Sequence, residues 1–238
     1  MLLPLIKYNI SYYAKTSKFI APSLVFIIFL FFIYNQIPIS IWSNFYITAM
    51  AIFVLTNWIG TSFLSSEDKT QGYITRLHAK NEKIYHISKI ASILVIMTPF
   101  YAILIFYPIV FGFFARGILA SELLVAVAMH FSFSLMGCAT SLFFDKNLSK
   151  KEAALPLQLV IILICVIPLA LIFEGNALVR YATYLLPPLN FLGQRLHDLD
   201  SGIFEINLSF LLFILYSLGY SLVLIVAYIF LVQKKNKR

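Results

Sequence analysis

The run IASILVIMTPFYAILIFYPIVFGFF, Ile90–Phe114, contains no Asp, Glu, Lys or Arg. A helix needs about 20 mostly apolar residues to cross the hydrocarbon layer of a bilayer, and this run is longer. The whole chain agrees, because 61% of its 238 residues are hydrophobic and only 12% are charged. Soluble domains carry about 25% charged residues. The sequence therefore predicts an all-α integral membrane protein whose main solvent is lipid.

Five further apolar runs have the length and composition expected of spans, although the first is short: Phe19–Tyr34, Phe45–Leu64, Glu122–Phe144, Leu155–Phe173 and Leu208–Val232. Six spans place both termini on one side of the membrane. If that side is cytoplasmic, it carries 15 of the 18 Lys and Arg residues, and only Arg116, Arg180 and Arg195 lie outside. Cytoplasmic loops are enriched in Lys and Arg. We therefore expect one membrane domain, residues 1–238, with both termini in the cytoplasm.

The N-terminal arm, residues 1–18, has apolar side chains at helical spacing and lysines on a neighbouring face: Leu3, Ile6, Ile10 and Tyr13 against Lys7, Lys15 and Lys18. Such a helix can lie in the membrane interface, with its lysines among anionic headgroups. The alternative is a simple extension of the first span, broken at Pro22. The formal charge of +8 is spread between apolar runs and does not form one basic face, so we expect no nucleic-acid partner.

The loop SSEDKTQGYITRLHAKNEKIYHISK, residues 65–89, holds eight of the chain's 28 charged residues. Long loops without a function are uncommon. Between Tyr73 and Ile87 the pattern predicts a helix with an imperfect apolar edge, formed by Tyr73, Ile74, Leu77, Ile84 and Tyr85. Such an edge needs a surface, which is the protein's own inner rim, the headgroup layer or a cytoplasmic partner. The alternative is a solvated charged loop.

A second long segment, residues 174–207, lies on the outer side and contains YATYLLPPLNFL. Pro187 and Pro188 prevent a continuous helix there. Non-helical backbone enters the membrane only where protein or a water-filled cavity covers it. The segment therefore predicts re-entrant outer helices before the last span, or else an interfacial loop with aromatic anchors.

Polar side chains inside the spans are candidate functional residues. His130 is the only ionisable side chain well inside a span, so it either packs against a neighbouring helix or lines a path. Thr56 and Asn57 need partners in hydrocarbon, which a helix–helix or subunit contact supplies. His197, Asp198 and Asp200, with Glu174 nearby, could bind a hard cation, but short clusters of this kind usually face water.

The sequence lacks the motifs of the commonest catalytic sites. No G-x-x-x-x-G-K-[ST] is present to hold ATP phosphates, and neither G-x-S-x-G nor H-E-x-x-H occurs. We therefore expect no catalytic residues, no resident metal and no cofactor on this chain. Any energy from ATP must enter through another polypeptide.

The six-span layout and the 65–89 loop resemble the permease subunits of ABC type-2 exporters. In that family the first long cytoplasmic loop begins with acidic residues and closes with a lysine at the third span. The matching residues here are Glu67, Asp68, Gly72, Leu77, Lys83, Tyr85 and Lys89. The chain departs from the pattern at Asn81, where proline is common, and at Ser88, where glycine is common.

The resemblance implies that the loop forms a coupling helix, which docks into a groove on a separate ATPase subunit that carries ATP and Mg²⁺. Its coupling residues would be Glu67, Asp68, Gly72, Tyr73, Ile74, Arg76, Leu77, Lys80 and Lys83. The cargo path would include Thr56, Asn57, His130 and Gln158, and the outer gate Tyr184, Pro187, Pro188 and Phe191. Two permease chains, identical or different, would pair above two ATPase copies.

The resemblance further implies export of an amphiphilic cargo, such as a peptide, an antimicrobial, a drug or a lipid-like molecule, from a bacterial cell membrane. Two other classes stay open from the residues alone. One is a membrane-embedded enzyme using His130 or the His197, Asp198 and Asp200 cluster. The other is a secondary transporter, which predicts internal repeats and midplane charges.

Overall fold

The computed structural model describes residues 2–79, 81–145 and 208–236, together with Gln158, Val160, Ile162 and Leu189. Over these residues the fold is helical and contains no strand. Four helices are long and apolar enough to cross a membrane. They are α3 (Ile41–Leu64), α5 (Glu82–Val110), α6 (Ala120–Ser141, extended by the short 3₁₀ turn η1, Leu142–Phe144) and α11 (Leu208–Asn236). The expectation of an all-α protein with membrane-spanning helices is confirmed.

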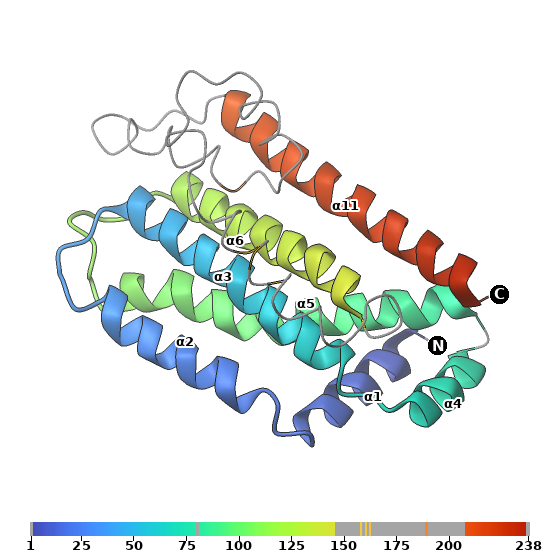
Figure 1. Ribbon diagram of the computed structural model, residues 1–238. Helices are drawn as coiled ribbons and strands as arrows, with labels where there is room; N and C mark the ends of the chain where they lie inside the picture. Colours follow the sequence, from blue (N-terminus) through green and yellow to red (C-terminus); the bar gives the residue numbers. More distant parts are fainter. Residues whose placement is uncertain are drawn as a thin grey trace.

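The long helices run side by side, with α3 and α6 in the middle and α11 along α6 (Figure 1). Most of α3 and α6 is buried, whereas less than a third of the apolar stretch of α5 and of α11 is buried, and both helices carry exposed apolar side chains. In a bilayer such exposed apolar surface faces lipid or another membrane protein. The start of the chain, α4 (Lys69–Ala79) and the end of α11 gather at one end of the bundle (Figure 1).

Two glycines allow α3 and α6 to approach closely. A Cβ atom on Gly137 of α6 would lie 2.5 Å from the backbone oxygen of Phe53 and 3.0 Å from the Thr56 Cβ, both on α3. A Cβ atom on Gly60 of α3 would overlap the Ser141 side chain of α6. Small residues at helix crossings are the usual means of close packing in membranes, where no hydrophobic force draws helices together.

The N-terminal arm and the first apolar run form two separate helices, α1 (Leu2–Ala14) and α2 (Ile20–Ile33). The chain turns between them at Ser17, whose φ is 56°. Pro22 lies in the first turn of α2, where its missing N–H costs no helical hydrogen bond, so the break is not at Pro22. At 1.5 Å per residue, α2 is about 21 Å long and falls short of the roughly 30 Å hydrocarbon core.

The charged 65–89 segment differs from the single helix expected over Tyr73–Ile87. It contains α4, and then α5 already begins at Glu82, well before the apolar run. Asn81 caps α5, because its side-chain oxygen accepts a hydrogen bond from the Lys83 N–H at 2.8 Å. The first turns of α5 therefore belong to the charged segment and not to the span.

At the opposite end of the bundle, two loops are joined through their backbones. The Ile39 N–H donates to the Phe113 carbonyl at 2.9 Å, and the Ala115 N–H donates to the Ile39 carbonyl at 3.4 Å. Arg116 forms a forked ion pair with the buried Glu122, which also accepts the Leu119 N–H at the start of α6. These contacts fix the α2–α3 and α5–α6 connections to each other.

Several expectations lie outside the described residues. They are the span Leu155–Phe173 apart from Gln158, Val160 and Ile162, the re-entrant segment 174–207 apart from Leu189, the gate residues Tyr184, Pro187, Pro188 and Phe191, the cluster of Glu174, His197, Asp198 and Asp200, and Lys80. These stay predictions, as does the count of six spans.

Candidate functional site

Helix α4 has two unlike faces. Gly72, Thr75 and Ala79 are buried against the bundle. On the other side Tyr73, Ile74 and Leu77 are exposed by 63%, 41% and 61%. We call these three residues the docking face. An exposed apolar group of this kind on a short, otherwise polar helix is typical of a surface that contacts something else.

Beneath α4 lies a buried ionic cluster, which we call the anchor: Glu67, Thr75, Tyr85 and Lys89. The Lys89 ammonium lies 2.7 Å from Glu67 Oε2, and both side chains are less than a tenth exposed. The Tyr85 hydroxyl donates to the same oxygen at 2.7 Å, and the Thr75 hydroxyl lies 3.0 Å from Oε1. Buried charges are stable only when paired and hydrogen-bonded, and here the carboxylate has three donors.

Aromatic contacts complete the anchor. The Lys89 ammonium lies 4.7 Å from the centre of the Tyr85 ring, and the Arg76 guanidinium lies 5.5 Å from it. Cations placed over an aromatic face are attracted by its quadrupole. Gly72 lies against the same group, since a Cβ atom there would be 3.4 Å from the Tyr85 hydroxyl oxygen.

The ionisation of Glu67 reflects two opposing effects. Burial would raise the pKa of its carboxyl group, but the Lys89 ammonium and the hydrogen bonds from Lys89, Tyr85 and Thr75 outweigh burial. The net result is a pKa below the ordinary value of 4.5. The carboxylate is therefore charged at neutral pH, and the ion pair is intact.

A second buried chain of hydrogen bonds continues from the anchor to α11. His86 follows Tyr85 on α5, and their rings meet edge to face with the ring centres 5.0 Å apart. The Tyr228 hydroxyl of α11 donates to Asp145 Oδ2 at 2.8 Å and lies 3.2 Å from His86 Nδ1. Because the hydroxyl hydrogen is used on Asp145, His86 Nδ1–H donates to the phenol oxygen. This chain joins α5, α11 and the end of α6.

Another polar group lies between the long helices. The Asn57 amide donates to the Thr140 hydroxyl at 2.7 Å, linking α3 to α6. The Gln158 amide donates to Asn57 Oδ1 and, at 2.7 Å, to the Thr61 hydroxyl. The Thr56 hydroxyl lies 3.4 Å from the Ser134 hydroxyl in the same crossing of α3 and α6. Three of the four predicted cargo-path residues, Thr56, Asn57 and Gln158, therefore come together.

His130, the fourth predicted path residue, lies apart from that group and is completely buried. Its Nδ1 faces the Ala126 carbonyl at 2.8 Å, and its Nε2 faces the Thr48 hydroxyl at 3.0 Å. Because the carbonyl can only accept, Nδ1 carries the hydrogen. Both ring nitrogens thus have partners inside the chain, which favours a packing role. A role in a path stays a prediction.

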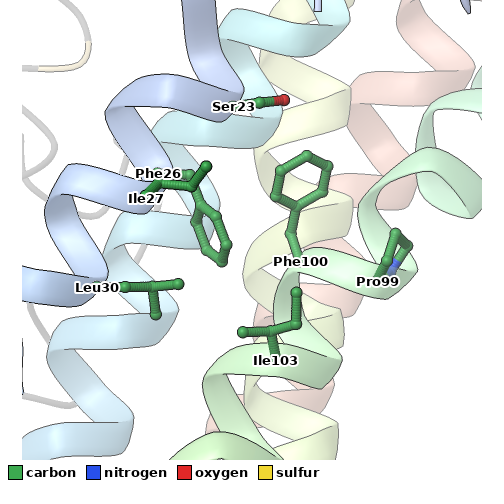
Figure 2. Close-up of a pocket in the computed structure, with 7 residues that line it drawn as sticks. All are labelled: Ser23, Phe26, Ile27, Leu30, Pro99, Phe100 and Ile103. Carbon is green, nitrogen blue, oxygen red and sulfur yellow. The ribbon is translucent and has the colours of Figure 1, made fainter. Parts of the chain in front are cut away.

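The described part of the chain also contains an apolar groove of about 260 Å³ between α2 and α5 (Figure 2). Figure 2 shows Phe26 and Leu30 of α2 facing Phe100 and Ile103 of α5, with Pro99 beside them. The Phe26 and Phe100 rings meet edge to face at 5.0 Å. Ser23 is the one polar lining residue, so the groove suits hydrocarbon rather than a charged ligand.

The predicted coupling residues divide into two groups. Asp68, Tyr73, Ile74, Leu77 and Lys83 are exposed, Arg76 is half-buried, and Glu67 and Gly72 are buried under α4.

Within residues 2–79, 81–145 and 208–236, no three His, Cys, Asp or Glu side chains come together as metal ligands. Sequence reasoning missed His86, Asp145 and Tyr228, because a tyrosine inside an apolar run and an acid at its end carry no distinctive signal.

Comparison of the chain with known protein families, with curated proteins and with solved structures found no match. The resemblance to ABC type-2 permeases accordingly stays a prediction from the sequence.

Proposed function

We propose that this chain is the membrane-spanning permease subunit of an ATP-driven exporter, and that α4 is the helix on which a separate ATPase subunit acts. The docking face of α4 carries the proposal. Three apolar side chains are exposed on a helix that joins two long apolar helices, and on the opposite side of that helix Thr75 contacts the buried ion pair of Glu67 with Lys89. An ATPase with an apolar groove would bury this face and could displace the anchored helix.

Other features support the same assignment. The start of the chain, α4 and the end of α11 share one end of the bundle, and the lysine-rich ends of the sequence belong there. That end is the cytoplasmic one under the positive-inside rule. Two permease chains pair in a bacterial cell membrane, with two ATPase subunits beneath them that carry ATP and Mg²⁺.

The cargo is an amphiphile, such as a hydrophobic peptide, an antimicrobial, a drug or a lipid-like molecule. It passes along α3 at the seam between the two permease chains. The half-exposed Ile47 and Trp58 on α3 suit the apolar part of such a molecule.

The decisive experiment is co-purification. We expect a P-loop ATPase gene beside this one; the two proteins are expressed together, and the complex is isolated in detergent. Leu77→Glu places a charge on the docking face, and we expect it to weaken ATPase binding by at least about 10-fold. Leu3→Glu is the matched control, because Leu3 is also exposed but lies on α1.

Two results would contradict the proposal. One is that no P-loop ATPase binds the wild-type chain. The other is that the Leu77→Glu and Leu3→Glu variants bind the ATPase equally well. If Leu77→Glu instead impairs only the association of α4 with vesicles of anionic lipid, the docking face is a membrane contact and the ATPase assignment is wrong.

A further inference from the structure

Helix α4 follows α3 directly in the sequence, yet it packs against α5, where the Arg76 guanidinium lies over the Tyr85 ring. Glu67, in the short link between α3 and α4, is held by Lys89 and Tyr85 of α5. Thr75, in the middle of α4, reaches the same carboxylate. The buried side of α4 therefore rests, through Thr75, on an ion pair that joins the α3–α4 link to α5.

The contacts do not end at α5. Tyr85 is followed by His86, and His86 is hydrogen-bonded to Tyr228 of α11, which donates to Asp145 beyond α6. The six residues along this route are each at most 5% exposed: Glu67, Tyr85, Lys89, His86, Tyr228 and Asp145. A continuous buried route thus joins the docking helix to two long helices.

We propose that Glu67, Tyr85 and Lys89 are positioning residues that hold the docking face on α5, so that displacement of α4 moves α5 and, through His86 and Tyr228, α11. This inference rests on the proposed function. The physical reason is the cost of separation: pulling α4 together with the link that carries Glu67 away from α5 would leave Lys89 or Glu67 as an unpaired charge in a buried site. The helices therefore move together.

The first test uses the chain alone and measures hydrogen exchange of the amides of residues 69–79. Lys89→Met and Glu67→Gln remove the ion pair, and we expect exchange in α4 to accelerate on the order of 100-fold. Lys83→Met and Asp68→Asn remove the same charges from exposed neighbours and should leave the rates unchanged. Tyr85→Phe, which keeps the ion pair, should give a smaller acceleration and serves if the other variants fold poorly.

The second test uses the complex with the ATPase. Spin labels on Ile87→Cys of α5 and Lys234→Cys of α11, with Cys138 and Cys165 replaced by alanine, report the distance between these helices. We expect Mg·ATP to shift that distance in the otherwise wild-type chain. Lys89→Met should bind the ATPase within about twofold of wild type but lose the shift, and the charge-exchanged pair Glu67→Lys with Lys89→Glu should regain part of it.

The outcomes separate the two proposals. Unchanged exchange in α4 of Lys89→Met and Glu67→Gln, or a full Mg·ATP shift in Lys89→Met, overturns the positioning role while leaving the ATPase assignment in place. Failure of the wild-type chain to bind an ATPase overturns the proposed function and the transmission with it, whatever the exchange rates are.

Discussion

Replacement of Gly137 by alanine should destabilise the protein through the closest contact between α3 and α6. The added Cβ atom would lie 2.5 Å from the Phe53 backbone oxygen, about 0.9 Å short of ordinary contact. A backbone oxygen cannot rotate away as a side chain can, so the helices must separate. Overpacking of this kind typically costs about 1–3 kcal/mol.

Separation of the helices also weakens the hydrogen bond from Asn57 to Thr140, for which membrane proteins show about 0.6 kcal/mol on average. The combined expectation is a loss of about 2–3 kcal/mol in the free energy of unfolding. For a chain of this length, that corresponds to a fall of roughly 4–12 °C in the melting temperature. Thermal unfolding of the purified protein in detergent, followed by intrinsic fluorescence, measures it.

Gly219→Ala is the matched control. Gly219 also lies inside a long helix, α11, but nothing lies within 4 Å of an added Cβ atom there. Alanine favours a helix over glycine by about 1 kcal/mol, so this variant should be as stable as wild type or slightly more stable. If Gly137→Ala proves as stable as Gly219→Ala, the close crossing of α3 and α6 is wrong.

Two further predictions concern the polar groups. Because the pKa of the Glu67 carboxyl is lowered on folding, the carboxylate stabilises the anchor above about pH 4.5, and this contribution is lost as the pH falls through the folded-state pKa. A spin label at His78→Cys should therefore become more mobile as the pH falls below about 4.5, and Glu67→Gln should abolish that pH dependence; the same pH dependence in both proteins would refute it. Asn57→Leu and Thr140→Val should each lower the free energy of unfolding by about 1–2 kcal/mol, and the double variant should lose less than the sum of the two. Thermal unfolding measures these losses. Additive losses would show that the two side chains do not interact.

The spans were predictable wherever an apolar run is long and uninterrupted. The runs expected at Phe45–Leu64, Glu122–Phe144 and Leu208–Val232 each coincide with a helix to within about four residues at either end. The start of α5 was not predictable, since hydropathy ends the span at Lys89. That lysine is tolerated in a buried position because Glu67, 22 positions away, neutralises it.

The candidate site was predictable in composition but not in arrangement. The pattern indicated a helix with an apolar edge in the 65–89 segment, and Tyr73, Ile74 and Leu77 are indeed exposed on α4. The same pattern placed Tyr85 on that edge, whereas the structure buries it under α4 as part of the anchor. Helical periodicity cannot show that the chain breaks near Asn81, which is what turns Tyr85 inward.

The backbone hydrogen bonds that join Ile39 to Phe113 and Ala115, which we call the clasp, also limit how the bundle can deform. It joins the two connections at the end away from α4, and the forked pair of Arg116 with Glu122 braces the same place. With that end secured, splaying of the helices would be widest around α4 and smallest at the clasp. The helices would then pivot about the far end, and small displacements near α4 would separate them most at the α4 end of the bundle.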